Sequence, residues 1–346
     1  MREKNNKKII FLLPVWGGGG GERVASDLSF NLPDNIEKVI VAFENKNYYP
    51  YRGRIISLNL PLSTNPILKL FNFLKGYFIF RRIILDEKPD YVISFGSLQN
   101  VINVLTFPKS IVRVDNPIAI SHKKFIEKLY PLFVKILFNK AHKIIVVSDG
   151  LRQELIERFK IKKENIDVVY NSIDVDEIKK LSEEQLEPAY EEIFRHPVII
   201  NIGSLIGQKG QANLIKAFKG LKARMNNAKL VILGEGVLEN RLKKMAKNLG
   251  VDKDIHFLGW QKNPFKFLAR SKVFVMPSLW EGFGIVILEA MACKIPVVSF
   301  DCDFGPREIL DPDSNISEKT QSIEYKKYGV LCPILRADYL EEAVFN

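Results

Sequence analysis

The sequence predicts an α/β protein of two domains, each built on a doubly wound parallel sheet. Its 346 residues exceed what one hydrophobic core usually supports. Short apolar runs alternate with longer helical patterns, which is typical of parallel sheets. Glycine-rich or polar segments follow those apolar runs directly, at the strand ends where such sheets bind ligands. We therefore expect an N-terminal domain at 1–180, a linker at 181–196 and a C-terminal domain at 197–346.

The first half contains apolar runs of strand length separated by helical patterns. Strands are expected at 9–15, 39–43, 91–95, 110–114, 143–147 and 167–170. Apolar residues recur at helical spacing between them, which predicts helices at 65–85, 122–143 and 149–159.

The second half repeats the alternation. Strands are expected at 198–202, 229–233, 255–258, 272–276 and 296–300, and helices at 211–222, at 238–249 and from about Ile285. The polar run 176–196 before them contains Pro188 and indicates a linker or a peripheral helix. A further helix pattern starts at Ala337, shortly before the sequence ends at Asn346.

The composition is that of a soluble globular chain, with 47% hydrophobic and 26% charged residues. No apolar run is long enough to span a bilayer, and the N-terminus lacks the pattern of a signal peptide. The three cysteines, Cys293, Cys302 and Cys332, are odd in number and show no metal-ligand spacing. This usage predicts a reducing compartment and no disulfide framework.

The formal net charge of +11 is concentrated in the first half. Residues 1–180 carry a net charge of +10 and residues 181–346 carry +1. Such asymmetry suggests an anionic partner surface, either nucleic acid or acidic lipid. The patterns at 65–85 and 122–143 interleave lysine and arginine with apolar residues, so they fit core-facing helices, membrane-surface helices, or both. No nucleic-acid-binding module is recognisable, and we expect no nucleic-acid partner.

Five consecutive glycines at 17–21 follow the first strand and precede a helix start at Glu22. A glycine turn at this position lets a ligand approach backbone amides. The spacing also fits a dinucleotide-binding loop loosely, with Glu44 near the place of a ribose-binding acid. A nicotinamide-dependent enzyme is therefore one alternative.

The stretch 277–298 places two carboxylates around another glycine turn. Glu281 lies in the turn with Gly282 and Gly284, and Glu289 lies in the second turn of the following helix. Isolated glycines before a helix let N–H groups approach an anion, and the helix dipole favours negative charge there. The plain alternative is an ordinary connection between a strand and a helix.

These residues resemble a specific signature. Glu281 and Glu289, with Gly282, Phe283 and Gly284 between them, resemble the E-x7-E motif of retaining GT-B glycosyltransferases of family 4. Other segments match in the family's order: the turn 203–210, the glycines at 234–236, the Gly259-Trp260 pair and the domain-ending segment 171–174. The resemblance covers nearly the whole chain. It implies a GT-B fold, in which two Rossmann-like domains face each other across a cleft.

The resemblance also implies roles for individual residues. It assigns Glu281 to the hydroxyls of the donor sugar, Glu289 to the ribose, and Lys209 to the leaving diphosphate. Hydrogen-bond chemistry permits these roles, and a full positive charge at a leaving group is a strong catalytic device. The remaining donor-binding candidates are Gly20, Gly21, Ser204, Gly234, Gly236, Trp260, Gly282, Phe283, Gly284, Ile285 and Val286.

The sequence departs from the family's pattern at several points. Ser204 stands where many members carry an arginine. Asp115 and Asn116 occupy about the place of a histidine that many members present from the first domain, and His122 is the nearest histidine. We rank Asp115 and Asn116 above His122 as catalytic partners. The family's closing helix is expected to be short or absent after Ala337, which predicts a truncated chain.

The D-x-D triplet at 301–303 matches a metal–diphosphate motif of another glycosyltransferase fold. So short a motif arises readily by chance, and we expect neither a metal nor a cofactor. The following segment 305–309 resembles the family's G-x-x-E-I segment and places Glu308 near the donor.

The resemblance implies a retaining, metal-independent glycosyltransferase. It would move a hexose or N-acetylhexosamine from a nucleotide sugar, expected to be UDP-linked, to a lipid-linked or polysaccharide acceptor in capsule or lipopolysaccharide synthesis. We expect cytoplasmic location, with peripheral attachment to the inner face of the plasma membrane through the basic first half. A GT-B-like nucleotide-sugar epimerase is a second alternative, besides the nicotinamide-dependent enzyme.

Overall fold

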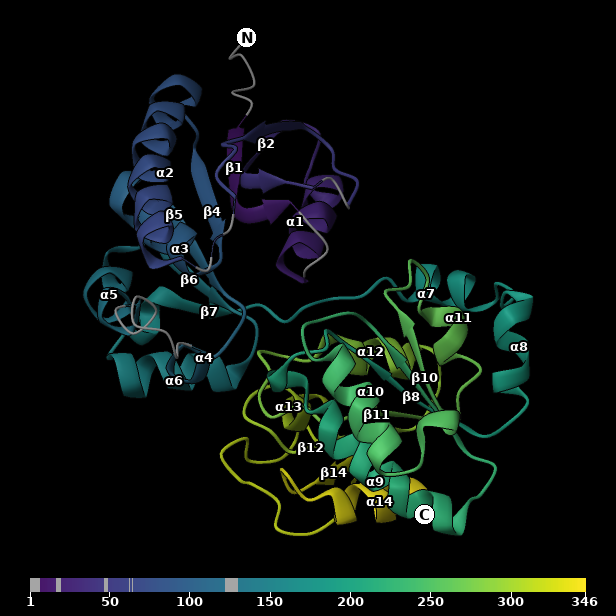
Figure 1. Cartoon of the computed structure of the whole chain (residues 1–346). Coiled ribbons are helices and arrows are strands. Elements are labelled where there is room, and N and C mark those ends of the chain that lie inside the picture. The colour runs from purple at the N-terminus through teal and green to yellow at the C-terminus, as the bar shows by residue number, and fades with distance from the viewer. Residues whose placement is uncertain (1–6, 17–19, 47–48, 62, 64, 122–129) are drawn as a thin grey trace. The chain divides into compact units, whose positions relative to one another are not determined.

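The computed structural model describes residues 7–16, 20–46, 49–61, 63, 65–121 and 130–346. The chain divides into two compact units, Met1–Tyr170 and Asn171–Asn346. Each unit contains its own seven-stranded sheet, and Figure 1 shows helices around both sheets. The predicted fold class, two doubly wound α/β domains, is confirmed.

The first unit is built on a fully parallel sheet with the strand order β3-β2-β1-β4-β5-β6-β7. Its strands are β1 (Lys7–Trp16), β2 (Ile36–Asn45), β3 (Arg54–Ser57), β4 (Tyr91–Phe95), β5 (Ser110–Val114), β6 (Lys143–Val146) and β7 (Ile166–Val168). Its described helices are α1 (Gly20–Asn31), α2 (Pro66–Glu87), α3 (Ser97–Thr106), α4 (Ile118–Ser121), α5 (Tyr130–Leu137) and α6 (Asp149–Phe159). The strand β3 and the helices α3 and α4 were not predicted from the sequence. Of the predicted helix 122–143, residues 122–129 lie outside the described residues and α5 ends at Leu137.

Strand β1 is the third of the seven strands in this sheet, and the strand order reverses between β1 and β4. Its residues Ile10 to Leu13 are fully buried, because helices cover a parallel sheet on both faces. The carboxyl end of β1 therefore lies at the topological switch point of the sheet, the position at which such sheets bind ligands.

The second unit contains a sheet with the order β10-β9-β8-β11-β12-β14-β13, in which only β13 runs antiparallel to its neighbour. Its strands are β8 (Val198–Ile202), β9 (Lys229–Leu233), β10 (Ile255–Gly259), β11 (Val273–Met276), β12 (Val297–Phe300), β13 (Glu324–Lys326) and β14 (Gly329–Cys332). The switch point lies between β8 and β11. The five strands predicted in this half are confirmed, and β13 and β14 are additional.

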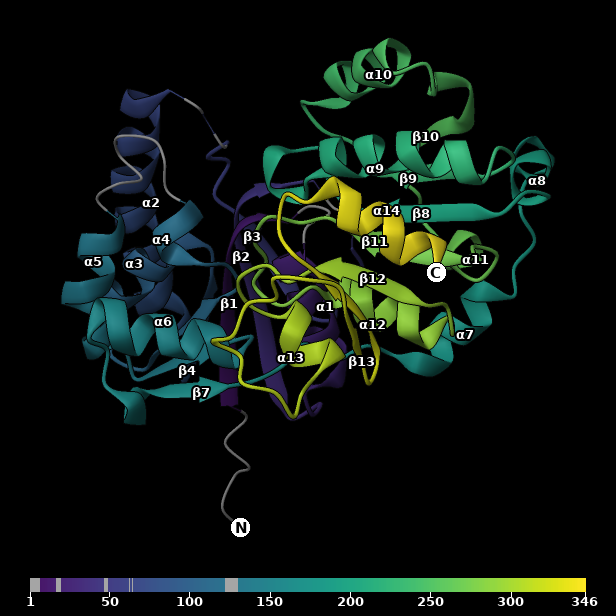
Figure 2. The same ribbon diagram turned by 90° about the horizontal axis from the view of Figure 1, so that it is seen from below.

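The helices of the second unit are α7 (Val175–Ser182), α8 (Pro188–Phe194), α9 (Gln211–Arg224), α10 (Glu239–Asn248), α11 (Phe265–Leu268), α12 (Ile285–Ala292), α13 (Pro306–Leu310) and α14 (Ala337–Phe345). Helix α14 packs beside α9, as Figure 2 shows. Within the described ranges, no helix combines the length and the apolar character that a bilayer crossing requires.

The segment before β8 corrects the predicted domain boundary. The units separate after Tyr170, not at residue 180. Helix α7, whose N-cap Asp174 accepts a hydrogen bond from the amide of Glu177 at 2.8 Å, packs against α11 and α12 of the second unit. The predicted linker 181–196 contains α8, and Glu187 before it forms a 2.7 Å ion pair with Lys266. This polar segment is therefore part of the second unit.

Candidate active site

The candidate site is built from two loops at the switch point of the second sheet. One loop follows β8 and the other, from Pro277 to Gly284, follows β11. The amide of Leu279 donates to the carbonyl of Gln208 at 2.8 Å, and the Gln208 side chain donates to the carbonyl of Trp280 at 2.9 Å. These bonds hold the two loops side by side, as expected for neighbouring strands of a parallel sheet.

Gly210 permits this close approach. Its backbone has φ of +64°, and a Cβ atom there would lie 1.9 Å from the carbonyl oxygen of Pro277. Only glycine combines that backbone conformation with the absence of a side chain. The preceding 3-10 turn Gly207–Lys209 consequently points Lys209 toward the loop after β11.

Lys209 and Glu281 form a direct ion pair. The ammonium of Lys209 donates to both carboxylate oxygens of Glu281, at 2.6 and 2.9 Å, and the hydroxyl of Ser278 donates to one of them at 2.6 Å. Glu281 is buried and Lys209 is half-buried. Charge-assisted bonds at a buried carboxylate fix its position strongly. The sequence predicted Lys209 and Glu281 but missed Ser278, which stands three residues before Glu281.

The start of helix α12 lies next to this ion pair. Gly284 is its N-cap, in a left-handed conformation and without a side-chain hydrogen bond to the first turn. Ile285 and Val286 begin the helix and are half-buried, whereas Gly282 and Phe283 before them are buried. A helix start without a capping side chain presents backbone N–H groups and a positive dipole end to an anion.

Glu289 lies on α12 and is also buried. Burial, together with the negative charge of Glu289, raises the pKa of the Cys293 thiol to about 11. The two carboxylates of the signature thus come from different elements, Glu281 from the loop and Glu289 from the helix.

The loops after β9 and β10 pack on the loop after β8. A Cβ atom on Gly234 would lie 2.2 Å from the carbonyl oxygen of Gly203, and one on Gly236 would lie 2.4 Å from that of Leu205. Both predicted glycines therefore serve backbone packing in this structure. Trp260 is exposed after β10, and Ser204 is exposed beside Leu205.

The D-x-D triplet has a structural explanation. Asp301 is buried and receives hydrogen bonds from the Arg307 guanidinium, the shortest at 2.5 Å, and from the amide of Thr320 at 2.8 Å. The carbonyl of Asp303 accepts the amide of Glu281 at 3.2 Å. The triplet therefore supports the loop that carries Glu281. Within the described ranges, no group of three histidine, cysteine or acidic residues could hold a metal ion.

The first unit contributes predicted residues at its own switch point. Gly20 and Gly21 open α1, and a Cβ atom on Gly21 would lie 3.8 Å from a carboxylate oxygen of Asp115. Asp115 follows β5 and accepts a 2.7 Å hydrogen bond from Arg113, whereas Asn116 is exposed. The structure thus brings Asp115 and the start of α1 together. Gly17 to Gly19 and His122 lie outside the described residues.

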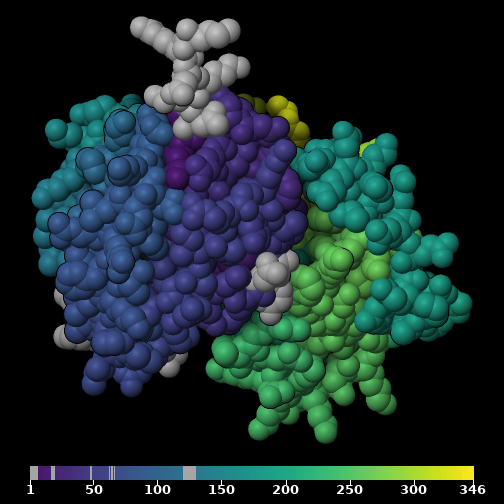
Figure 3. Space-filling model, turned by 90° about the horizontal axis from the view of Figure 1, so that it is seen from above, coloured from purple at the N-terminus to yellow at the C-terminus, as the bar shows by residue number. Residues whose placement is uncertain are grey.

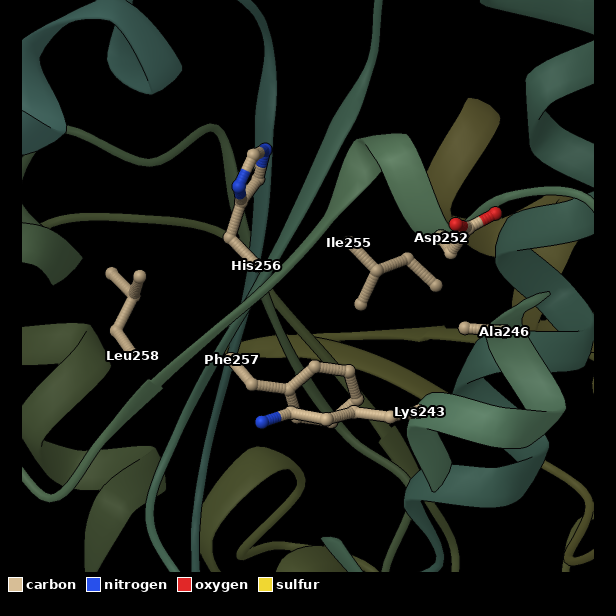
Figure 4. A pocket seen from close by; sticks show the side chains of 7 residues that line it. All are labelled: Lys243, Ala246, Asp252, Ile255, His256, Phe257 and Leu258. Atoms are coloured by element: carbon tan, nitrogen blue, oxygen red, sulfur yellow. The ribbon is translucent and has the colours of Figure 1, made fainter. Parts of the chain in front are cut away.

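A separate cavity of about 340 Å³ lies along β10 and α10. Figure 4 shows its lining residues: Lys243, Ala246, Asp252, Ile255, His256, Phe257 and Leu258. None of the predicted site residues is among them. Burial lowers the pKa of His256, which favours the neutral imidazole.

Two family models match successive parts of the chain. The model described as Glycosyltransferase Family 4 matches residues 18–177, and the model described as Glycosyl transferases group 1 matches residues 183–327. An uncharacterized glycosyltransferase of Methanocaldococcus jannaschii is 39% identical over 282 residues, which cover 78% of this chain and 70% of that relative. The chain belongs to glycosyltransferase family 4.

Further similarities agree with the assignment of this chain to a glycosyltransferase family. A Campylobacter jejuni enzyme, named N-acetylgalactosamine-N,N'-diacetylbacillosaminyl-diphospho-undecaprenol 4-alpha-N-acetylgalactosaminyltransferase, is 31% identical over 89% of this chain and 84% of its own length. The structure of Anabaena HepE with UDP and glucose gives a TM-score of 0.73 at 16% identity, covering 98% of this chain and 89% of that one. WaaG, a glycosyltransferase involved in lipopolysaccharide biosynthesis, gives 0.72 at 19% identity, covering 98% and 90%.

The predicted GT-B fold and the predicted enzyme class are therefore confirmed. Membership of this family favours sugar transfer over the epimerase and the nicotinamide-dependent alternatives.

Proposed function

We propose that this glycosyltransferase moves a hexose or N-acetylhexosamine from a UDP-linked sugar to a lipid-linked or polysaccharide acceptor, with retention of the anomeric configuration and without a metal. The acceptor belongs to the synthesis of a cell-surface glycan such as capsule or lipopolysaccharide. The reaction takes place in the cytoplasm, at the inner face of a membrane whose acidic lipids attract the basic first half of the chain.

One observation carries the proposal: Lys209 and Glu281 meet at the switch point of the second sheet, beside the uncapped start of α12. A nucleoside diphosphate needs positive charge and N–H donors, and a sugar needs carboxylate acceptors. This cluster presents both kinds of group within one pair of loops.

Each group has a distinct role in the proposal. The amides of Gly284, Ile285 and Val286 bind the diphosphate, and Lys209 stabilises the negative charge that develops on it. Glu281 accepts hydrogen bonds from hydroxyls of the transferred sugar. Glu289 accepts them from the ribose. Asp115 and Asn116 are the proposed catalytic residues of the first unit.

None of the site residues predicted from the sequence is a second carboxylate placed to act as a nucleophile. We therefore favour a direct displacement on one face of the sugar. The bond between the anomeric carbon and the leaving phosphate oxygen breaks, and the acceptor oxygen bonds to the same face of that carbon. The acceptor proton passes to the departing phosphate. This same-face displacement differs from the two-carboxylate scheme of retaining glycosidases, which passes through a covalent intermediate.

The names of relatives support the proposed donor and acceptor. The Campylobacter enzyme is named for a diphospho-undecaprenol acceptor, and an Escherichia coli relative, 27% identical over 89% of this chain, is named lipopolysaccharide 1,6-galactosyltransferase. Anabaena HepE has been solved with UDP and with UDP-glucose. The metal-free proposal is supported by Asp301, because its carboxylate is already engaged by Arg307 and Thr320.

A donor screen tests the proposal. Nucleotide release is measured with UDP- and GDP-hexoses and N-acetylhexosamines, with and without a prenyl-diphosphate-linked sugar as acceptor, in the presence of EDTA. We expect acceptor-dependent release of UDP, an axial product linkage from an axial donor by NMR, and loss of release in Glu281→Gln. Release of GDP alone, inversion at the anomeric carbon, a requirement for metal or full activity of Glu281→Gln would refute the corresponding part.

A further inference from the structure

Helix α2 carries a stripe of large apolar side chains on its outer face. Ile67, Phe71, Leu74, Phe78 and Leu85, called here the α2 stripe, are between 47% and 80% exposed. At 100° per residue these five positions fall within about 60° of one another around the helix. They extend over about 27 Å of helix length. The helix is blue in Figure 1 and contributes to the blue surface in Figure 3.

The opposite face of α2 is held firmly against the first sheet. Phe80 is fully buried in the core of that sheet, and Gly76 lies directly on the ring of Phe43. Asn65 caps the helix start by accepting hydrogen bonds from the first turn. The helix is therefore apolar on two sides. Its inner side already packs in the core of the sheet, so the α2 stripe cannot be buried there as well.

Glu87 fixes the other end of α2. Its carboxylate accepts a two-point hydrogen bond from Arg54 at 2.6 and 2.9 Å and another from Lys8 at 3.0 Å. These hydrogen bonds lower the pKa of Glu87 to about 2, and the bond from Arg54 has the largest effect. The ends and the inner face of α2 are thus fixed, which keeps the stripe directed outward.

The charge around the α2 stripe is mainly positive, although the exposed Asp86 beside Leu85 forms a 3.9 Å ion pair with Arg82. From Pro66 to Leu85 the helix contains lysine and arginine but no acidic residue. Lys75, Arg81 and Arg82 are exposed, and their positions on the helix flank the stripe on both sides. Contiguous exposed apolar patches on a protein surface mark interaction sites. A flat apolar surface with a basic border complements an anionic bilayer, which offers hydrocarbon beneath a layer of negative headgroups.

We infer that the α2 stripe inserts into the headgroup region of an anionic membrane, with α2 lying parallel to the surface. The side chains of Phe71 and Phe78 enter the apolar boundary, and Lys75, Arg81 and Arg82 contact lipid phosphates. The inference goes beyond a general electrostatic attraction of the basic half, because it assigns an apolar, salt-resistant part of the affinity to named residues. It extends the proposed function by placing the enzyme where a lipid-linked acceptor resides.

Vesicle sedimentation tests the inference with the full chain and without donor or acceptor, so its outcome is separate from that of the transferase proposal. The vesicles contain phosphatidylcholine alone or with one-third phosphatidylglycerol, at low and high salt. The apolar variant is Phe71→Gln/Phe78→Gln, and the basic variant is Lys75→Gln/Arg81→Gln/Arg82→Gln. The matched control, Val237→Gln/Leu335→Gln, changes two exposed apolar residues of the second unit.

The wild-type chain and the control should bind the anionic vesicles far better than the neutral ones. The apolar variant should lose about 100-fold in partition coefficient at both salt concentrations. The basic variant should lose about 100-fold at low salt and much less at high salt. Circular dichroism and unfolding midpoints should match wild type, because the changed side chains are exposed.

Two results would overturn the inference. One is wild-type retention of the apolar variant on anionic vesicles. The other is a wild-type dimer in light scattering that becomes a monomer in the apolar variant, because the stripe would then be covered by a second copy of the chain.

Discussion

Removing the charge of Lys209 separates its catalytic contribution from its structural one. The variant Lys209→Met keeps most of the side-chain volume and loses the ammonium that donates to Glu281 at 2.6 and 2.9 Å. Under the proposed mechanism, it also loses the cation that stabilises the leaving diphosphate.

The two expected effects have different sizes. The side chain of Glu281 is 8% exposed and that of Lys209 is 26% exposed. Breaking a fully buried ion pair costs about 3–5 kcal/mol, and solvent near Lys209 reduces this to about 2 kcal/mol in free energy of unfolding. Loss of one preorganised charge at a leaving group costs about 3 kcal/mol in the transition state, which is about a 150-fold decrease in kcat.

The assay combines steady-state nucleotide release with urea unfolding. Lys219→Met, on the exposed side of α9, serves as the control for loss of one lysine charge. In the double variant Lys209→Met/Glu281→Gln the unpaired carboxylate is gone, so stability should return toward wild type while turnover stays low. A kcat for Lys209→Met within threefold of wild type would refute the catalytic reasoning. Unchanged stability would refute the structural part.

Three further perturbations test the framework of the site and of α2. Gly210→Ala should lower the free energy of unfolding by more than about 2 kcal/mol, because its φ is positive and its Cβ would meet a backbone oxygen of the facing loop at 1.9 Å; Gly207→Ala, with open space around it, should be nearly neutral. Arg307→Met should lower the free energy of unfolding by about 3–5 kcal/mol, because the buried carboxylate of Asp301 loses its ion pair with the Arg307 guanidinium. Glu87→Gln should cost about 2 kcal/mol at pH 7 after allowance for solvent screening, and about 1 kcal/mol less at pH 4.

The sign for Glu87 follows from its lowered pKa of about 2. Its stabilising contribution is fully present above the unfolded pKa of about 4.5 and disappears as the pH falls toward 2. Urea titrations at both pH values measure it, and a difference between wild type and variant that grows on acidification would contradict the assignment. Equal stabilities of the two glycine variants would contradict the packing argument at Gly210. A stability loss below about 1 kcal/mol in Arg307→Met would show that its ion pair with Asp301 is dispensable.

The sequence was sufficient for the two-sheet fold and for the neighbouring positions of Lys209 and Glu281. Strand and helix periods are local properties, and parallel strands end at a common edge, so Lys209 and Glu281 were expected on neighbouring loops. Their direct contact was not expected, because it depends on side-chain directions across 72 positions of the chain. Ser278 was missed for the same reason.

Other errors arose where composition and packing disagree. The polar segment before β8 resembles a linker, yet buried Ile178 and Leu186 fix it to the second unit. Strand β3 is only four residues long and half-exposed, so its period is too short to recognise. Packing on another loop requires glycine at 234 and 236, a structural role that the sequence analysis did not predict.

The ion pairs of Arg307 with Asp301 and Glu324 connect the position of Glu281 to the edge of the second sheet. Arg307 also donates to Glu324 on the edge strand β13, at 3.3 Å, and the carbonyl of Asp303 holds the amide of Glu281. Edge hairpins open locally more readily than central strands. An opening of β13 and β14 would therefore loosen the loop of Glu281 while the rest of the sheet remains folded. Amide hydrogen exchange at Glu281 should accordingly follow that of the hairpin, so an opening at the edge of the sheet would limit how long the site stays assembled.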